Sequence, residues 1–155
     1  MFSVQKIPGL SYFAQQIVLP TISLGSADMQ NPMIVVPLPG EQMTFEPLTL
    51  DFLVDERMEN YRAIYDWITG LGFPENHSQY TTWNSTDPLS GSELKKNASD
   101  ATLSILDGSN NVIQNIQFYD CWPETLGSLT FLSSSQDVQY LVGSVTFRYT
   151  SYKFI

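Results

Sequence analysis

The sequence predicts an α+β domain: a mostly antiparallel β-sheet of β-sandwich character, covered by one amphipathic helix and interrupted by a long loop. Three observations predict this class: β-prone runs joined by turn residues, one run with helical spacing, and strands that do not alternate with helices. The length of 155 residues fits a single domain, which can bury about 69% of the surface of its extended chain.

The N-terminal 39 residues are expected to form an extended arm or short strands, because prolines and a glycine repeatedly break the β-prone run from Tyr12 to Val36. Gly40 to Val54 then predicts a half-buried strand. Thr49 and Asp51 fall on its polar parity, and the opposite parity is apolar, with Leu48, Leu50, Phe52 and Val54.

A helix is predicted from Glu56 to Thr69, with Asp55 as the N-cap and carboxylates in the first turn, where they meet the positive end of the helix dipole. Its apolar residues recur at spacings of three and four, and glycines end the pattern. We therefore expect one side of this helix to pack onto the sheet through Met58, Tyr61, Tyr65 and Ile68.

A polar segment from Phe73 to Ser99 shows neither hydrophobic period and predicts a long loop, in which Tyr80 and Trp83 could contact a partner. Two hairpins should follow it. The first joins 101–106 to 112–119 through the turn 107–111, and the second joins 128–132 to 138–152. In the longer C-terminal strand, Thr146, Arg148 and Thr150 oppose an apolar parity of Leu141, Val145, Phe147 and Tyr149.

The charge balance excludes several function classes. Seven basic and sixteen acidic residues give 7 − 16 = −9, and no basic stripe is present to neutralise the phosphates of DNA. No apolar run is long enough to span a membrane, and no signal peptide is evident. No phosphate loop or Cys/His metal spacing is found, so no cofactor or metal is expected.

Candidate catalytic residues have simpler structural explanations. Cys121 is the only cysteine and is expected to be a buried structural residue at the end of a strand. His77, the only histidine, lies in the polar loop and is expected to be solvated. The acidic residues Asp55, Glu56, Glu59 and Asp66 could form a hydrolase pair, but their place at the helix start already accounts for most of them. The chain is therefore not expected to be an enzyme.

Two segments resemble a known family. Gly40 to Gly70, GEQMTFEPLTLDFLVDERMENYRAIYDWITG, places a Glu-Pro-Leu strand before Leu-Val-Asp-Glu and a helix that ends in Tyr-Asp-Trp. Ile116 to Leu126, IQFYDCWPETL, adds a strand and a Trp-Pro turn. These segments resemble the tail completion and sheath stabiliser proteins, or tail terminators, of T4-like contractile-tailed bacteriophages, and more loosely the tail tube fold.

The resemblance implies a virion subunit, assembled in the host cytoplasm, whose sheet joins those of neighbouring copies in a hexameric ring. The ring would contact tail tube, tail sheath and neck proteins, and DNA would pass through its lumen without specific binding. Its wall would be acidic, because six copies carry 6 × −9 = −54 formal charges. The polar parity is then expected to face the lumen, with Thr49, Asp51, Thr146, Arg148 and Thr150.

Three alternatives remain open at the level of sequence. The chain could be a tail tube or baseplate tube-initiating subunit of the same fold, which would stack into cylinders. It could be a carbohydrate- or receptor-binding β module that uses Tyr80 and Trp83. The hydrolase hypothesis based on the carboxylates between Asp55 and Asp66 is the weakest of the three.

Overall fold

The computed structural model describes residues 1–5, 11–12, 14–72, 75–78, 97–131 and 140–155. One helix, α1 (Glu59–Gly72), and ten strands lie in these ranges. The strands are β1 (Phe2–Val4), β2 (Ser11–Tyr12), β3 (Ala14–Val18), β4 (Ile22–Gln30), β5 (Val35–Phe45), β6 (Leu48–Leu53), β7 (Ser99–Leu106), β8 (Val112–Leu126), β9 (Val142–Arg148) and β10 (Ser151–Phe154).

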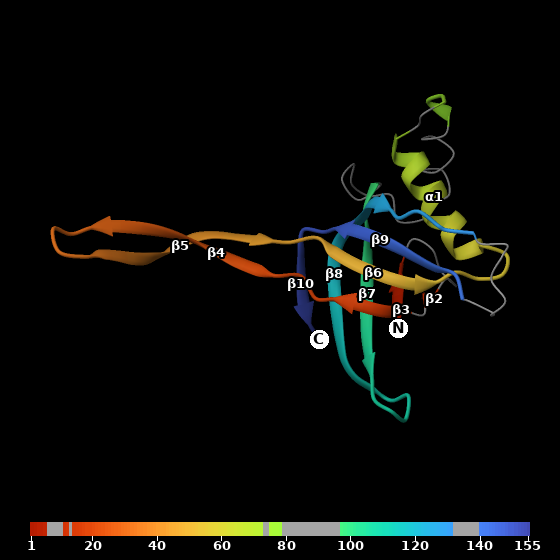
Figure 1. Ribbon diagram of the computed structural model, residues 1–155, viewed down its shortest axis with the longest axis horizontal. Helices are drawn as coiled ribbons and strands as arrows, with labels where there is room; N and C mark the ends of the chain where they lie inside the picture. The colour runs from red at the N-terminus through yellow and green to blue at the C-terminus, as the bar shows by residue number, and fades with distance from the viewer. Residues whose placement is uncertain (6–10, 13, 73–74, 79–96, 132–139) are drawn as a thin grey trace.

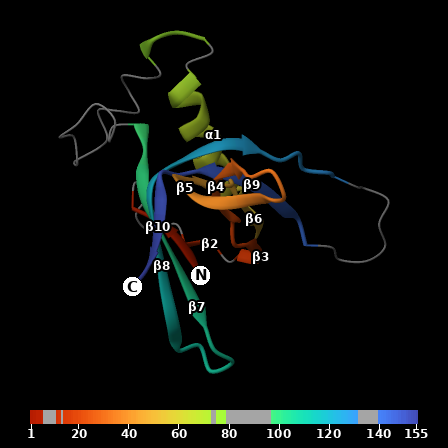
Figure 2. The ribbon, with the colours of Figure 1, turned by 90° about the vertical axis from the view of Figure 1, so that its left-hand side faces the viewer.

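The predicted class, a mostly antiparallel sheet with one helix, is confirmed. The large sheet has the order β2-β1-β7-β8-β9-β6-β3, and β10 adds a further pairing with β8. Strands β4 and β5 form a separate two-stranded sheet. The helix lies over one end of the large sheet, and the β7–β8 turn projects from the opposite end (Figure 1, Figure 2).

Strand β8 belongs to both halves of the large sheet. Its N-terminal half pairs with β7 and β10, whereas its C-terminal part, from Trp122, pairs with β9. The change of direction occurs at Asp120, whose φ of 53° lies in the left-handed region that Asp adopts more readily than most residues. Its backbone N–H donates to a carboxylate oxygen of Asp100 over 3.2 Å, so the irregularity costs no unpaired donor.

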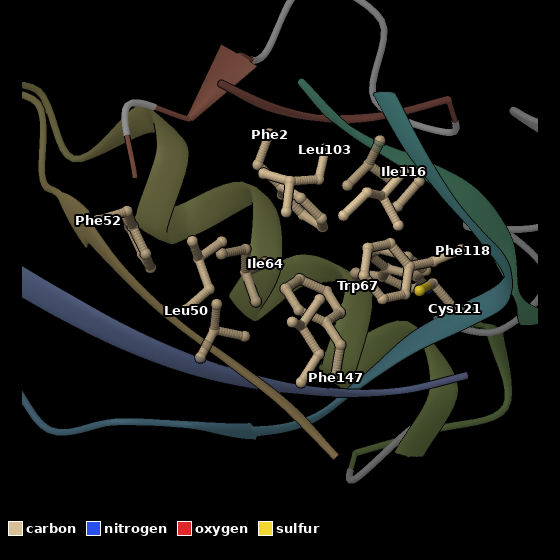
Figure 3. Close-up of a cluster of buried hydrophobic side chains, with 14 residues drawn as sticks. Phe2, Leu50, Phe52, Ile64, Trp67, Leu103, Ile116, Phe118, Cys121 and Phe147 are labelled. Atoms are coloured by element: carbon tan, nitrogen blue, oxygen red, sulfur yellow. The ribbon is translucent and has the colours of Figure 1, made fainter. Parts of the chain in front are cut away.

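The bend folds the sheet over one hydrophobic core (Figure 3). Phe2 of β1 and Phe147 of β9, which are not neighbours in the strand order, have ring centroids 5.5 Å apart. The ring centroid of Trp67, in the helix, lies 6.4 Å from that of Phe147. The core therefore joins both halves of the sheet to the helix, and its members are Phe2, Val4, Leu48, Leu50, Phe52, Ile64, Trp67, Ala101, Leu103, Ile116, Phe118, Cys121, Val145 and Phe147.

The expected alternation along β6 and β9 is seen in the burial of their side chains. Leu48, Leu50 and Phe52 are fully buried and lie opposite Phe147, Val145 and Gly143. Gly143 fits closely at this place, because a Cβ atom there would lie 3.0 Å from the Phe52 ring, a contact tighter than most. The polar parity of both strands points away from the core.

The helix begins three residues later than predicted and is rotated about its axis. Residues 55–58 form a turn in which the Met58 N–H donates to the Asp55 carbonyl, and Met58 has a φ of 54°. The Met58 carbonyl accepts the first helical hydrogen bond, so Met58, rather than Asp55, is the N-cap. The buried side of the helix carries Asn60, Ile64, Trp67 and Gly70.

The predicted packing set is therefore wrong in part. Tyr61 and Ile68 are half-buried at the borders of the buried stripe, and Met58 precedes the helix. Tyr65 is 56% exposed and faces solvent. Two stripes at spacings of three and four overlap in this sequence, and the stripe that contains Trp67 is the one in the core.

The N-terminal arm and the run that follows it also differ from expectation. β1 lies in the core, and the arm contains the long strands β4 and β5 where short strands were predicted. The run from Gly40 to Val54 is divided at Glu46 and Pro47 into β5 and β6. Proline has no N–H to donate to a sheet, which explains this break.

The first predicted hairpin is confirmed, and the second is wrong. Residues 128–131 form no strand, and 132–139 lie outside the described residues. β9 pairs instead with β6 and with the C-terminal part of β8, in which Pro123 lies opposite Phe147 beside a register shift. The expected Trp-Pro turn is thus a strand, with its proline at an irregularity where a missing N–H is tolerated. The run 138–152 is divided into β9 and β10.

The connection between β6 and the helix depends on Asn60, a residue that the sequence did not single out. Its side chain is 5% exposed, and its Nδ2 donates to the Leu53 carbonyl over 2.7 Å. Its Oδ1 accepts from the backbone N–H groups of Asp55, at 3.3 Å, and Tyr61, at 2.8 Å. One amide thus joins the end of the strand to the start of the helix.

We predict that Asn60→Ala lowers the free energy of unfolding by about 1–3 kcal/mol, because partly buried backbone groups lose their partners. Tyr65→Ala should change it by less than about 0.5 kcal/mol, because that side chain is exposed. Urea unfolding of both variants provides the measurement. A loss at Tyr65 as large as that at Asn60 would contradict the observed orientation of the helix.

Candidate assembly surfaces

Strands β4 and β5 form a two-stranded ribbon, residues 22–45, that projects from the body of the domain (Figure 1). Every residue of β4 is exposed, and neither strand pairs with the large sheet. Its large apolar side chains face solvent, and Met33, in the turn, is 97% exposed. The other exposed members are Ile22, Leu24, Met29, Ile34, Val35, Leu38 and Met43.

The register makes each half of the ribbon amphipathic, because directly opposed residues of an antiparallel pair lie on the same face. Four apolar pairs alternate with more polar ones. The Ser23 and Thr44 hydroxyls, for example, lie 2.5 Å apart, and Asp28 lies opposite Pro37. The apolar pairs are Ile22 with Phe45, Leu24 with Met43, Ala27 with Leu38, and Met29 with Val36.

Two glycines allow the strands to approach each other in the middle of the ribbon. The register shifts between Leu24 and Ser26, and the apolar positions of β4 change parity at the same place, so the apolar pairs of the two halves lie on opposite sides of this strand. A Cβ atom on Gly40 would lie 2.5 Å from the Gly25 carbonyl oxygen, closer than such atoms can come. Glycine is therefore required at position 40.

The ribbon has the properties of a surface that another protein covers. An isolated two-stranded hairpin is marginally stable at best in water, and large contiguous apolar patches are rare on soluble monomers. The described contacts of the ribbon with the body lie at its base, where Phe45 meets Tyr149 and Tyr152. Burial against a partner would remove the apolar side chains from water.

A second surface, the polar face, is the solvent-facing side of β3, β6, β9 and the C-terminal part of β8. Thr49, Thr146 and Thr125 form one row across three strands. Gln16, Asp51 and Ser144 form the next row. The predicted residues Thr49, Asp51, Thr146 and Arg148 thus lie together, whereas Thr150 lies beyond the end of β9 and donates its N–H to the Tyr119 carbonyl.

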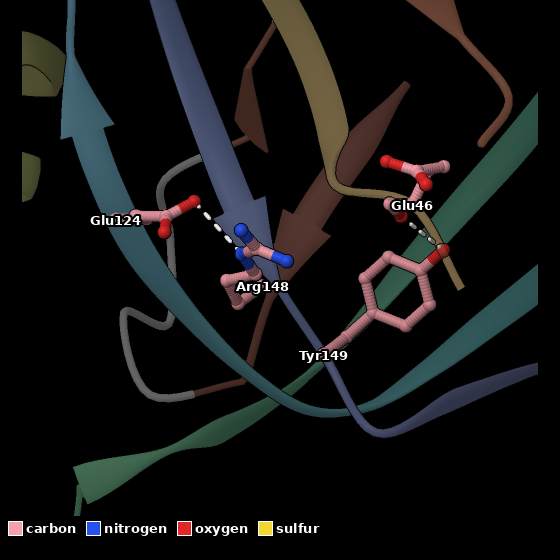
Figure 4. A network of polar contacts seen from close by, with 4 residues as sticks. All are labelled: Glu46, Glu124, Arg148 and Tyr149. Atoms are coloured by element: carbon pink, nitrogen blue, oxygen red, sulfur yellow. Dashed lines mark hydrogen bonds and ion pairs between the residues drawn. The ribbon is translucent and has the colours of Figure 1, made fainter. Parts of the chain in front are cut away.

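Arg148 forms the main ion pair of the polar face. Its Nε donates to Oε2 of Glu124 over 2.9 Å (Figure 4), and this contact raises the pKa of the guanidinium. Trp122, 40% exposed, lies opposite Arg148 on the neighbouring strand. Glu124 therefore offsets the positive charge that the sequence placed on this face.

The polar face is nearly neutral, although the whole chain carries a net charge of −9. It carries Asp51 and Glu124 against Arg148, so its charge is 1 − 2 = −1. Acidic residues instead gather at the start of the helix, where Glu59 approaches Arg57 at 3.8 Å.

The remaining candidate residues do not assemble into a described catalytic site. Tyr80 and Trp83 lie outside the described residues. His77 is exposed, and Asp66 lies on the helix surface, 3.8 Å from Arg62. In the described ranges, no three His, Cys, Asp or Glu residues are placed to hold a metal ion. No described helix is long and apolar enough to cross a membrane.

The Asp107 side chain stabilises the turn between β7 and β8. One carboxylate oxygen of Asp107 accepts from the N–H groups of Ser109, at 2.8 Å, and Asn111, at 2.9 Å. These bonds lower the pKa of Asp107. Together with Asn110, whose φ is 63°, they form the tight connection between β7 and β8.

Comparison with known proteins confirms the resemblance seen in the sequence. The chain matches none of the family models with which it was compared. It is 28% identical over 148 residues to the tail tube terminator protein of Enterobacteria phage T4, covering 95% of this chain and 72% of that protein.

Solved structures of contractile injection systems share the fold. The tube terminating cap of the anti-feeding prophage aligns with a TM-score of 0.62 at 16% identity, over 99% of this chain and 87% of that one. A PVC sheath/tube terminator aligns with a TM-score of 0.57 at 18% identity, over 99% and 91%. A chain of the anti-feeding prophage baseplate aligns with a TM-score of 0.63 at 12% identity, over 99% and 89%. The same fold therefore occurs in caps and in baseplates.

We predict that Cys121 is unreactive in the folded protein. Burial, with a contribution from Asp100 and Asp120, raises its pKa to about 12, and the thiolate is the reactive form. At pH 8 alkylation should be slow in buffer and fast in denaturant, where the pKa is about 8.5. Stability should fall as the pH rises from about 8.5 toward about 12, because only the unfolded chain ionises this thiol there. Fast labelling of the native protein would contradict the observed burial.

Proposed function

We propose that this chain is a structural subunit of a contractile phage tail, which forms a hexameric ring that terminates the tail tube. The ring would stabilise the last sheath ring, connect to neck proteins, and have no enzymatic role. The proposal is supported by similarity to the T4 terminator over 95% of the chain. The structural observation that carries it is the ribbon, whose large apolar side chains beyond its base face solvent in the described structure.

A ring also suits the edges of the large sheet. In the described part of the chain, β3 pairs only with β6, and β10 pairs only with β8, so each presents one open edge. Open edges favour pairing with further chains. Head-to-tail interfaces generate a closed ring when the rotation between neighbouring copies closes on itself. Neighbouring subunits would protect these edges and cover the ribbons.

The polar face is assigned to the lumen in this proposal. Its rows of hydroxyl and amide groups offer DNA neither an array of cations nor a strong repulsive field. Arg148 is engaged by Glu124, which weakens its attraction for phosphate. DNA would therefore pass through the lumen without being retained. As a tail component, the ring would assemble in the host cytoplasm.

A tube or baseplate tube-initiating subunit is the second candidate. The similarity to a baseplate chain, with a TM-score of 0.63, favours it. Stacking separates the two functions, because a tube subunit polymerises into cylinders, whereas a terminator adds one ring to the end of a tube. Negative-stain images of the purified protein, alone and with tail tubes, distinguish a ring, a cylinder and a monomer.

We predict that Met29→Lys abolishes ring formation, whereas the matched control Gln30→Lys retains it. Both residues lie in β4 and are exposed, but Met29 is on the apolar face and Gln30 is on the opposite face. Neither belongs to the core, so both variants should melt with the parent. Negative stain and sedimentation provide the measurement. Rings formed equally by both variants would exclude the apolar face as an assembly surface.

The lumen assignment predicts that Asp51→Lys folds normally and makes the ring bind DNA. The residue is half-exposed on the polar face, so stability should change by about 0.5 kcal/mol or less. Glu56→Lys, an exposed residue before the helix with the same charge change, serves as the control. Short linear duplex DNA should bind the first variant at low salt, whereas closed circular DNA, which cannot thread a ring, should not. Equal binding of both DNA forms would place position 51 outside the lumen.

A further inference from the structure

The ribbon meets the body of the domain at its base. Its two strands are joined there by a hydrogen bond from the Glu46 N–H to the Thr21 carbonyl, 3.1 Å long. The nine residues of β4 make the ribbon about 30 Å long. A small rotation at the base therefore moves the tip by several ångströms. Its direction must be fixed where it leaves the body if its apolar face is to meet a neighbour.

A cluster of aromatic rings lies at this point. Phe45, the last residue of the ribbon, has its ring centroid 6.0 Å from that of Tyr149 and 5.8 Å from that of Tyr152. The two tyrosine rings are 6.1 Å apart. Both also contact Phe118, at 5.1 and 5.5 Å, and Phe118 is fully buried in the core. The ribbon is thus connected to the core through two tyrosines.

Tyr149 adds a directional contact to this packing. Its hydroxyl donates to the Glu46 carbonyl oxygen over 2.8 Å (Figure 4). A tyrosine hydroxyl is protonated at neutral pH and can donate this bond, and burial raises the pKa of Tyr149 further, to about 12. The bond ends on the backbone between β5 and β6, at the place where the chain enters the body.

Tyr152 reaches the ribbon from the C-terminal strand. β10 is an edge strand that pairs with β8, and Tyr152 lies opposite Phe118 in that pairing. No residue of β10 is among the fully buried core residues. Removing its aromatic ring should therefore affect the base of the ribbon more than the core.

We propose that the segment from Tyr149 to Tyr152, which leads from β9 into β10, acts as a clamp, in which Tyr149 and Tyr152 are positioning residues that fix the direction of the ribbon. The clamp is a property of the free subunit. Its consequence for assembly rests on the proposed function, because a correctly directed ribbon is what a neighbouring chain would meet.

The test measures the direction of the ribbon before any assembly. Spin labels on cysteines introduced at Gln30, near the tip, and at Ser109, in the β7–β8 turn, report the distance between ribbon and body by pulsed electron resonance. Both positions are exposed, and the native Cys121 is buried. The parent should give one narrow distance distribution. Tyr152→Ala should lose it and give a broad one, whereas the exposed control Tyr65→Ala should retain it.

Tyr149→Phe keeps the ring and removes only the hydroxyl, so it provides a second variant if Tyr152→Ala does not fold. Its distribution should broaden or shift while its melting temperature stays close to that of the parent. A folded Tyr149→Phe variant with the parental distribution would overturn the hydroxyl contact as a positioning element. A folded Tyr152→Ala variant with the parental distribution would overturn the clamp itself.

Images of the same samples separate this inference from the proposed function. Broad distributions together with loss of rings support both the clamp and its role in assembly. Broad distributions with intact rings support the clamp and overturn that role. If the parent forms no rings, alone or on tubes, the proposed function fails, and the distances still decide the clamp.

Discussion

The fold depends on the bend of β8 at Asp120. A single strand of fifteen residues pairs with β7 and β10 along one half and with β9 along the other. This arrangement brings Phe2 onto Phe147 and encloses the core. The left-handed backbone at Asp120 is tolerated because its N–H is bonded to the Asp100 carboxylate. Without the bend, the apolar faces of the two halves would lie open to water.

The core and the exposed apolar ribbon are separate parts of the molecule. The core ends at the base of the ribbon, where Phe118 is buried and Phe45 is half-buried. Beyond that point, β4 and β5 carry apolar side chains that contribute nothing to the core. A chain that places so many such side chains on a projecting ribbon gains stability from them only on association.

The polar face suits a function of contact without chemistry. Its rows of Thr, Ser and Gln side chains carry few charges, and its arginine is bonded to a glutamate. The overall charge of −9 therefore says little about this face, since charge depends on where side chains lie as well as on their number. A nearly neutral wall and an apolar ribbon are compatible with a structural ring subunit.

The sequence by itself determined the elements whose signals are local. The alternation in β6 and β9 set their buried and exposed faces, because side chains of a strand alternate whatever it pairs with. The hairpin of β7 and β8 followed from its turn residues, and the family resemblance followed from two contiguous segments.

Only the tertiary structure decided the features that depend on distant partners. The buried stripe of the helix was decided by the fit of Trp67 against Phe147, eighty positions away, so Tyr65 could not be placed from its spacing. The pairing of β9 with β8 required the bend at Asp120, a single backbone angle that no pattern of hydrophobicity records. The sequence did not predict the ribbon either. Its prolines weaken any strand signal, and its direction is fixed by tyrosines more than a hundred residues further along the chain.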